Sequence, residues 1–420
     1  MLSEVDAGPV AGHLVQGERD SVRGVTFPDD ARSSLQPSPP GRVHARGPRP
    51  TLRERFRAFR IARVASPAFQ RWAAGFLLTR RIAQRNTRAL FDLCAGFTYS
   101  QVLFACVRLD LFHTLRPGPL PTAALAERFR LAPERAERLL KAATSLDLIT
   151  RLPDARWALA DLGAALIGNP SVAAMIEHHA MLYADLADPV ALLRGETGPT
   201  RLSGYWPYAM AAEPDAAEAD AVAGYSRLMA ASQALIAEDV LDAYPLASHA
   251  CLLDVGGGEG AFVTAAAARH PGLRLMLFDL PAVAARAEAR LGAAGLPVAC
   301  RGGSFFSDPL PRGADAISLV RIVHDHDDAR VAVLLRAAHD ALPPGGTLLV
   351  AEPMAGTPGA EPIGDAYFGF YLLAMGSGRA RTAEELSAML RAAGFAEIRT
   401  VNTRRPLLTR LIAARKSAKV

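Results

Sequence analysis

The spacing of apolar residues changes near residue 250, where a helical period gives way to short continuous apolar runs. Between residues 51 and 245, apolar side chains recur every three or four positions, which predicts amphipathic helices. Residues 1–50 lack this period and end in a stretch rich in Pro, Gly and Arg, so we expect a disordered tail. The change of period predicts two folded parts that meet near residues 240–250.

Helical segments separate four short apolar runs in the second half of the chain. The runs lie at 251–255, 273–280, 314–320 and 346–353. Strands that alternate with helices indicate βαβ units. We therefore predict a Rossmann-like α/β domain over 246–420, with a parallel, doubly wound sheet.

Residues 91–245 form the predicted helical domain, and part of it has the pattern of a winged helix. A helix over 122–129 and a second one over 134–149 precede two short strands around a Pro-Asp turn. The charges on the second helix nearly cancel. DNA recognition requires a basic face toward the phosphates, so we favour a structural or dimerising use of this domain and expect no nucleic-acid partner.

The formal net charge of +5 is concentrated in one segment. Residues 51–90 contain ten arginines and a single acid, Glu54, whereas the chain after residue 90 is slightly acidic. Aromatic residues alternate with these arginines, and a break at Ser66-Pro67 predicts two basic amphipathic helices. We favour a solvated face that packs on a dimer partner. The alternative is an interfacial segment that rests on anionic lipid.

The cellular location is predicted from three features of the sequence. The four cysteines are scattered without C-x-x-C spacing, which fits a reducing compartment. The N-terminal residues lack the basic and apolar regions of a signal peptide. No run of 18 uncharged apolar residues occurs, so we expect no membrane-spanning helix. A cytoplasmic protein is expected, at most peripheral on the inner membrane.

A glycine-rich turn follows the first predicted strand, in the sequence LLDVGGGEGAF. Gly256, Gly258 and Gly260 allow tight turns and a close approach of a ligand to the backbone. Asp279, at the end of the second strand, suits two ribose hydroxyls, which NAD and S-adenosylmethionine both offer. Asp254 favours S-adenosylmethionine, because a carboxylate there would repel a pyrophosphate but would organise the loop around a cationic amino-acid group.

An acid-flanked histidine follows the third predicted strand, in the sequence RIVHDHDD. His324 would lie at the carboxyl edge of the sheet, where the sites of α/β proteins form. The run of His and Asp over 324–328 has the residue types of a metal site, but adjacent loop residues point in different directions and no pair has i, i+4 spacing. We therefore expect no metal and a histidine that acts as a general base.

Together these motifs resemble the S-adenosylmethionine-dependent O-methyltransferases of the caffeate/hydroxyindole type, over about 90–415. The resemblance rests on DVGGGEG, FDLP, GGSFFSDPLPRGADAI, the His-Asp of RIVHDHDD, and LLVAEP. It implies a winged-helix dimerisation domain, a homodimer and S-adenosylmethionine as cofactor. Residues 69–112 are also similar to the bacterial carotenoid branch, the hydroxyneurosporene (demethylspheroidene) O-methyltransferases. That similarity implies O-methylation of a tertiary hydroxyl on an acyclic hydroxycarotenoid.

The resemblance also implies roles for individual residues. His324 is the expected catalytic base, and Asp325 and Glu352 are the acids expected to orient it and to stabilise its charge. A second acid that the family places near this histidine would fall at Ala380 and is missing. The expected cofactor contacts come from Asp254, Gly256, Gly258, Gly260, Asp279, Leu280, Ser304, Phe305 and Arg321. Ser304 and Phe305 replace the family's usual Asp-Met pair near the adenine, so the hydrogen bond there differs.

The expected acceptor pocket is built from helices of both domains. Its candidate residues are His178, His179, Met181, Phe368, Phe370, Tyr371 and Met375; at helical spacing, such residues are also typical of an ordinary core. The run 366–376 is nearly free of charge and suits a long hydrocarbon better than a polar phenol. A tertiary alcohol is no more acidic than water, whose pKa is about 15.7. We therefore expect His324 to take the proton in the transition state.

Other functions stay open at the level of the sequence. Within the same chemistry, the acceptor is alternatively a soluble phenol, quinone or polyketide. From other classes, the pattern also admits a winged-helix regulator that senses a nucleotide, and an NAD-dependent oxidoreductase. The neutral second helix argues against the regulator, and Asp254 argues against NAD.

Overall fold

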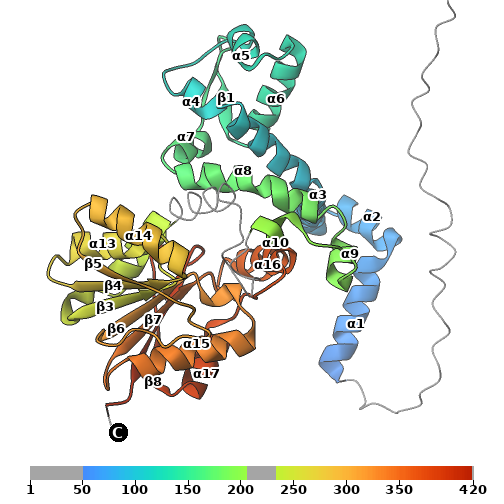
Figure 1. Ribbon diagram of the computed structural model, residues 1–420. Helices are drawn as coiled ribbons and strands as arrows, with labels where there is room; N and C mark the ends of the chain where they lie inside the picture. Colours follow the sequence, from blue (N-terminus) through green and yellow to red (C-terminus); the bar gives the residue numbers. More distant parts are fainter. Residues whose placement is uncertain (1–50, 206–232, 419–420) are drawn as a thin grey trace, which may run out of the picture. The chain divides into compact units, whose positions relative to one another are not determined.

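The computed structural model describes residues 51–205 and 233–418 (Figure 1). The predicted disordered tail, 1–50, lies outside the described residues. The chain divides into two compact units between Leu90 and Phe91.

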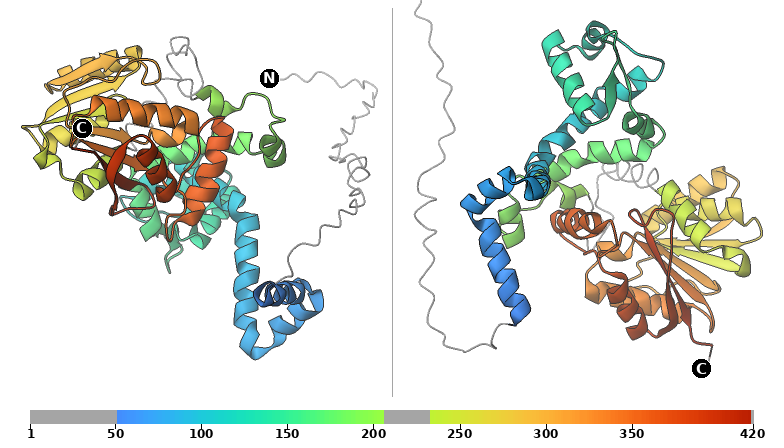
Figure 2. Two further views of the ribbon diagram at one scale, coloured as in Figure 1. Left: turned by 90° about the horizontal axis from the view of Figure 1, so that it is seen from below. Right: turned by 180° about the vertical axis from the view of Figure 1, so that it is seen from behind.

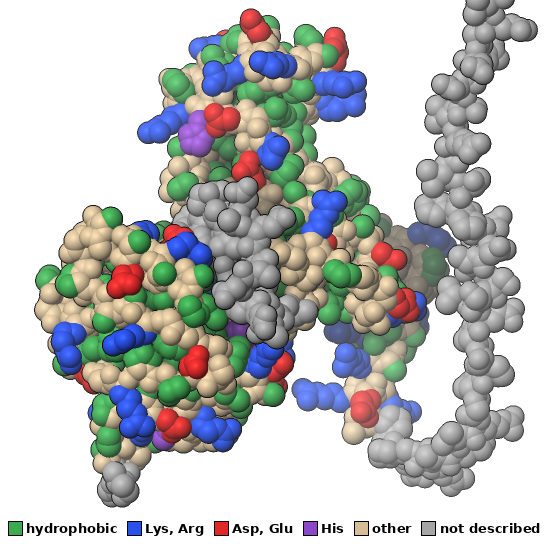
Figure 3. Space-filling view, in the orientation of Figure 1, with side chains coloured by type: hydrophobic (Ala, Val, Ile, Leu, Met, Phe, Trp, Pro, Cys, Tyr) green, Lys and Arg blue, Asp and Glu red, His purple; other side chains and the backbone are tan. Residues whose placement is uncertain are grey.

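The first unit contains two short helices and the start of a long one. They are α1 (Leu52–Ala65), α2 (Pro67–Gly75) and α3 (Leu77–Arg108), of which α3 continues into the second unit. The predicted break is confirmed: Ser66 caps α2 and Pro67 is its first residue, where its missing N–H costs nothing. Of the residues in α1 and α2, only Ala73 is buried. Figure 3 shows several basic side chains on the surface of α1.

Among the described residues, one helix, α3, is long and apolar enough to cross a membrane by length and composition. Its most apolar stretch has a mean hydropathy of 1.5, and 6% of that stretch is buried. No membrane-spanning helix was expected from the sequence; α3 passes this test of length and composition because an apolar stretch can hold a charge or two and keep a high mean hydropathy. Composition alone does not decide what covers the helix, since a contact with a second protein chain produces the same pattern.

The predicted winged helix is confirmed in the second unit. A two-stranded antiparallel sheet pairs β1 (Ile149–Arg151) with β2 (Trp157–Leu159), and Trp157 is almost fully buried. The helices around this hairpin are α4 (Leu111–Leu115), α5 (Thr122–Phe129), α6 (Pro133–Ser145) and α7 (Asp161–Ile167). The connecting helices that follow are α8 (Pro170–Asp185), α9 (Pro189–Arg194), α10 (Arg201–Tyr205) and a helix over 233–243.

A seven-stranded sheet is the centre of the other part of the second unit, and its strands have the order β5-β4-β3-β6-β7-β9-β8. The first five strands of this order run parallel, and β9 is antiparallel to both of its neighbours. The strands are β3 (Cys251–Val255), β4 (Arg274–Asp279), β5 (Val298–Gly302), β6 (Ala316–Val320), β7 (Thr347–Glu352), β8 (Phe395–Val401) and β9 (Arg410–Lys416). The predicted doubly wound α/β fold is confirmed.

Helices cover both faces of this sheet, as Figures 1 and 2 show. On one face, α13 (Ala261–Arg269), α14 (Pro281–Ala293) and the 233–243 helix pack against alternate residues of the buried strands. On the other face, α15 (Asp328–Ala341) and α17 (Ala383–Ala392) pack against the intervening residues. Successive side chains of a strand point to opposite faces, so β3, β6 and β7 are buried along their whole length because of this double cover.

A seven-residue π-helix (Pro362–Phe368) leads directly into α16 (Gly369–Met375) and brings an aromatic surface over the site. It packs with α8 and α10 in one apolar cluster. Because α8 follows the winged helix in the chain, this cluster joins the two halves of the second unit.

Candidate functional site

Polar side chains gather at the carboxyl ends of the parallel strands. Asp254 lies near the end of β3, Asp279 ends β4, and Glu352 ends β7. His324 lies in a short 3-10 turn, η4 (Val323–Asp325), just beyond β6. Neighbouring parallel strands end at the same edge of a sheet, so these residues lie close together although they are far apart in the sequence.

The glycine-rich turn has the conformation that its sequence predicts. Gly256, Gly258 and Gly260 have φ angles of 69°, 57° and 83°, a region that residues with a side chain rarely adopt. A Cβ atom at Gly256 would lie 2.5 Å from Cδ1 of Ile322. A Cβ atom at Gly258 would meet nothing within 4 Å, so the turn opens to free space at that residue.

Two carboxylates flank this turn. Asp254 is 2% exposed and accepts a hydrogen bond of 2.6 Å from the Ser318 hydroxyl. Burial raises its pKa to about 7, the Ser318 hydrogen bond opposes that rise, and the charge of Asp279 adds to it. Asp279 accepts hydrogen bonds from the N–H groups of Gly258 (2.8 Å) and Leu280 (2.7 Å), and burial still raises its pKa. A pair of desolvated acids is a favourable place for a cation.

Ser304 and Phe305 follow β5 in a compact turn. The Ser304 hydroxyl accepts a hydrogen bond from the N–H of Phe306 (3.3 Å), and the Phe305 ring packs edge-on against His326. Sequence analysis gave His326 no role in binding. Its ring is buried, Nδ1 has no hydrogen-bond partner among the described residues, and burial lowers its pKa to about 4.

Two carboxylates hold the two ring nitrogens of His324. Nδ1 forms a very short hydrogen bond with Glu352, and Nε2 lies 3.1 Å from Oδ1 of Asp325. Glu352 also accepts hydrogen bonds from the N–H groups of Ile322 (2.9 Å) and Val323 (2.6 Å), so one carboxylate fixes both the ring and its backbone.

The electrostatics of His324 result from opposing effects. Burial lowers its pKa, but the charges of Asp325 and Glu352 outweigh burial, so the pKa lies above its ordinary value. Burial also raises the pKa of Asp325, against the attraction of His324. Arg321 lowers both pKa values through its charge, which places it near the pair. The backbone of Arg321 has a φ angle of 59°, and its N–H donates to the carbonyl of Ala351.

The π-helix and α16 present aromatic rings to His324. The Phe368 ring lies edge-on to the His324 ring, with centroids 6.0 Å apart. Tyr367 packs against Phe368 and forms a hydrogen bond of 2.7 Å with Nε2 of His179. This Tyr367 contact was missed in the sequence analysis, although Tyr367 lies in the apolar run that drew attention to its neighbours.

A second Tyr–His pair lies beside the first. The Tyr371 hydroxyl forms a hydrogen bond of 2.7 Å with Nε2 of His178, and the rings of Tyr367 and Tyr371 are 5.9 Å apart. Burial lowers the pKa of His178 to about 4, lowers that of His179, and raises that of Tyr367 to about 12. All three side chains are therefore neutral near pH 7. Phe368, Tyr367 and Tyr371 form an aromatic wall that, with its two histidines, is polar but uncharged.

The remaining acceptor candidates have different surroundings. Met181 and Met375 belong to the same apolar cluster as Tyr367 and Tyr371. Phe370 is half-buried on α16 and is not a member of that cluster. Within 51–205 and 233–418, no group of three His, Cys, Asp or Glu side chains is arranged to hold a metal ion.

Comparison with known proteins identifies related sequences. Residues 183–396 match the family model of the O-methyltransferase domain, and residues 91–169 match that of the O-methyltransferase dimerisation domain. The chain is 46% identical over 355 residues to demethylspheroidene O-methyltransferase of Cereibacter sphaeroides, which covers 84% of this chain and 93% of the relative. It is 44% identical over 344 residues to demethylspheroidene O-methyltransferase of Rhodobacter capsulatus, with 81% and 84% covered.

The fold is also similar to that of a solved enzyme. The crystal structure of human N-acetylserotonin methyltransferase in complex with SAM superimposes with a TM-score of 0.66 and 26% identity. The match covers 79% of this chain and 98% of the human one.

Proposed function

Since the chain belongs to the O-methyltransferase family, we propose that it transfers a methyl group from S-adenosylmethionine to a hydroxyl group of an acyclic hydroxycarotenoid. The observation that supports this reaction most directly is the His324–Glu352 pair at the sheet edge that also holds Asp254 and Asp279. Such an edge combines a cation-binding loop with a base.

The residues of the glycine-rich turn fit S-adenosylmethionine. The carboxylate of Asp279 is half-buried at the carboxyl edge of the sheet, where it suits the two ribose hydroxyls of the cofactor. The raised pKa of Asp254 shows the cost of burying an acid, and a cationic ligand would offset that cost. The open space at Gly258 admits a ligand against the backbone. When bound, S-adenosylmethionine supplies a methyl group on a positively charged sulfur, which is already activated for transfer.

The protein's own task is then to orient the acceptor hydroxyl and to accept its proton. In the proposed reaction, the acceptor oxygen gains the methyl group and its proton passes to Nε2 of His324. Glu352 keeps the other ring nitrogen protonated and so leaves the lone pair on Nε2. Asp325 and Glu352 stabilise the imidazolium that forms. General-base help of this kind contributes roughly 10²- to 10⁴-fold.

A long apolar acceptor suits the aromatic wall. Phe368 lies against His324, and the wall continues through Tyr367 and Tyr371 without a charged group. His178, His179, Met181 and Met375 complete the proposed acceptor surface. The two relatives named for demethylspheroidene support an acceptor of this class.

Competing acceptors test the proposal. The purified enzyme is assayed with S-adenosylmethionine and, in parallel, an acyclic 1-hydroxycarotenoid in detergent micelles, a catechol and a naphthol. We expect the carotenoid to give the highest kcat/KM. A higher kcat/KM with either phenol would contradict the carotenoid assignment and leave the O-methyltransferase reaction intact.

We also propose that the enzyme is a homodimer. Residues 91–169 match a dimerisation domain, and the part of α3 within it exposes Phe91, Leu93 and Phe97. A second copy that covers these side chains would remove the patch from water. Light scattering during gel filtration should give twice the chain mass of 44.6 kDa.

Residues 51–90 are a separate candidate for contact with the membrane in which carotenoids dissolve. Phe56, Phe59 and Trp72 are 69%, 57% and 53% exposed, and ten arginines accompany them. Aromatic side chains beside a strong positive charge fit an anionic lipid surface. We accordingly propose a cytoplasmic enzyme with peripheral contact to the inner membrane.

Vesicle sedimentation tests this contact. Wild-type protein should pellet with phosphatidylglycerol vesicles and much less with phosphatidylcholine. The double substitution Arg57→Gln/Arg60→Gln should weaken the pelleting, whereas the control Arg336→Gln/Arg391→Gln, which removes the same charge elsewhere, should not. Equal pelleting of both double variants would end the proposal.

A further inference from the structure

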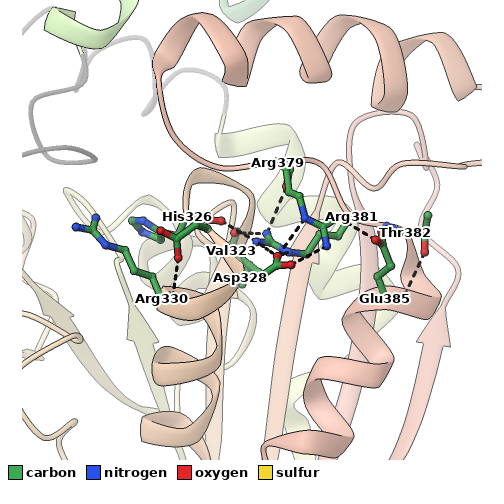
Figure 4. A network of polar contacts seen from close by, with 9 residues as sticks. Val323, His326, Asp328, Arg330, Arg379, Arg381, Thr382 and Glu385 are labelled. Atoms are coloured by element: carbon green, nitrogen blue, oxygen red, sulfur yellow. Dashed lines mark hydrogen bonds and ion pairs between the residues drawn. The ribbon is translucent and has the colours of Figure 1, made fainter. Parts of the chain in front are cut away.

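The turn that carries His324 is held from the side by a buried arginine. Arg381 lies between α16 and α17, and its side chain is 1% exposed. Its guanidinium donates to the carbonyl of Val323 (2.9 Å) and to the carbonyl of His326 (2.8 Å). Figure 4 shows Arg381 beside Val323 and His326. These two residues flank His324 in the chain, so one rigid group holds the backbone on both sides of the histidine.

The same guanidinium is anchored to the next helix. Its Nε and Nη2 atoms donate to Oδ1 of Asp328 at 2.9 Å and 2.7 Å. Asp328 is the first residue of α15, which packs on the sheet. Arg381 therefore ties the turn to a helix whose position the core already fixes, and its planar fork makes several hydrogen bonds at once.

The neighbouring residues close around the same turn. The Ser377 hydroxyl donates to the carbonyl of Asp325 at 2.9 Å. A Cβ atom at Gly378 would lie only 2.1 Å from the carbonyl oxygen of His324. The segment 377–381 thus packs directly on the backbone of the histidine and its neighbours. Ala380, where the second acid was expected, lies within this segment.

We propose that Arg381 is a positioning residue for the general base: it fixes the turn so that Nε2 of His324 keeps its place beside Asp325. This inference rests on the proposed role of His324. Glu352 holds the turn by accepting hydrogen bonds from two N–H groups, and Arg381 holds it by donating to two carbonyls. A displacement of about 1 Å in a reacting group can cost on the order of 10²-fold in rate.

Arg379 offers a matched control. It also pairs with Asp328 (3.1 Å) and with Glu385 (2.9 Å), but its side chain is 42% exposed. No hydrogen bond joins its guanidinium to the turn carbonyls in the described structure. Substitution of Arg379 thus perturbs the same ion-pair network without touching the turn.

The experiment compares Arg381→Lys, Arg381→Met and Arg379→Met in the full-length protein. Both Arg381 variants should lower kcat on the order of 10- to 100-fold. The dissociation constant for S-adenosylmethionine should stay within about threefold, because the cofactor acids belong to other strands. Arg379→Met should keep kcat within about threefold.

A second measurement separates positioning from mere stability and needs no acceptor. In histidine-labelled protein, the ring resonance of His324, assigned by its loss in His324→Gln, is titrated by NMR. Release of the turn weakens the contacts with Asp325 and Glu352, so the pKa of His324 should fall in the Arg381 variants and stay unchanged in Arg379→Met.

Wild-type kcat and wild-type His324 titration in Arg381→Lys would overturn the proposal. A lower kcat with an unchanged His324 pKa would also overturn it, because that result indicates a structural role only. If Arg381→Met fails to fold, the Lys variant decides. Failure of the underlying function would be visible separately, as wild-type turnover in His324→Ala.

Discussion

Oδ1 of Asp325 lies 3.1 Å from Nε2 of His324, the nitrogen that a general base needs free. At this distance a proton on Nε2 is shared between the imidazole and the carboxylate, so the apparent pKa values belong to the pair. Turnover requires that this proton leaves before the acceptor hydroxyl can donate its own. Asp325 therefore influences the pH at which His324 becomes available as a base.

The pH dependence of kcat should reflect this pair. Since the pKa of His324 is raised, kcat should increase with pH and reach half its maximum above pH 6.5, the ordinary value for histidine. In Asp325→Asn one of the two charges that raise this pKa is gone, so the midpoint should move to lower pH. The measurement is kcat from pH 5 to 9 at saturating substrates.

The exposed residue Asp327 is the control for that profile. It caps α15 through the N–H of Arg330, and Asn can make the same cap. Asp327→Asn should therefore keep the wild-type midpoint. A midpoint that does not move in Asp325→Asn would show that Asp325 does not hold the proton with His324.

Replacement of the base itself should abolish most of the rate. We expect His324→Ala to lose roughly 10²- to 10⁴-fold in kcat. Binding of S-adenosylmethionine, measured by calorimetry, should change little because Asp254 and Asp279 stay in place. Turnover near the wild-type rate would mean that His324 is not the base.

Asp279 should govern cofactor affinity rather than the chemical step. Its carboxylate orders the turn through Gly258 and faces the proposed ribose site. Hydrogen bonds to a charged group contribute about 1.5–3 kcal/mol. Asp279→Ala should therefore raise the dissociation constant for S-adenosylmethionine by roughly 10- to 100-fold. An unchanged constant by calorimetry would remove Asp279 from the cofactor site.

Acid should destabilise the fold partly through His178. Its pKa is about 4 in the folded protein and near 6.5 in an unfolded chain, so only the unfolded chain takes up a proton as the pH falls from 6.5 toward 4. His178→Gln removes this titration and keeps an acceptor for Tyr371. Between pH 7 and 4.5, urea unfolding should show that wild type loses about 2–3 kcal/mol more than the variant.

The ion pair between the buried Asp239 and the partly exposed Arg405 should be important for stability. Asp239 is fully buried and accepts hydrogen bonds from Arg405 at 2.9 Å, which joins the 233–243 helix to the chain before β9. Arg405→Met would leave a buried carboxylate unpaired and should cost about 3–5 kcal/mol in urea unfolding. Arg404→Met removes an exposed pair with Asp242 and should cost less than about 1 kcal/mol. Equal losses would contradict the distinction.

Sequence reasoning succeeded where a local pattern determines the structure. The strands β3, β6 and β7 are mostly apolar because both of their faces are covered, and this pattern is visible without a structure. The strand β5 was missed because its exposed and half-buried residues form no such run, and β8 alternates too weakly.

In the candidate site, too, contacts between segments that are far apart in the sequence could not be predicted. His324 and Glu352 lie at the ends of two neighbouring strands, and their pairing was implied by the family resemblance rather than by the spacing of the residues. The contact of Arg381 with the turn joins its side chain to a backbone carbonyl 58 residues away in the chain and depends on the path of a loop. Charge and composition give no signal for such a contact. Tyr367 was missed for a similar reason, since helical spacing alone does not show which residue of an aromatic run turns toward α8.

The π-helix that begins at Pro362 makes the aromatic wall tolerant of a change in chain length. A π turn holds one residue more than an α turn in about the same rotation, whereas one extra residue in an ordinary α-helix rotates everything after it by about 100°. If a single exposed residue such as Ala366 were deleted, the π turn would close to an α turn and the residues on its two sides would keep nearly the same orientation. Phe368 and Tyr371 would then still face His324 and His178 together. One residue can thus be lost at this turn with the wall intact, whereas a deletion within α16 would rotate the residues that follow it.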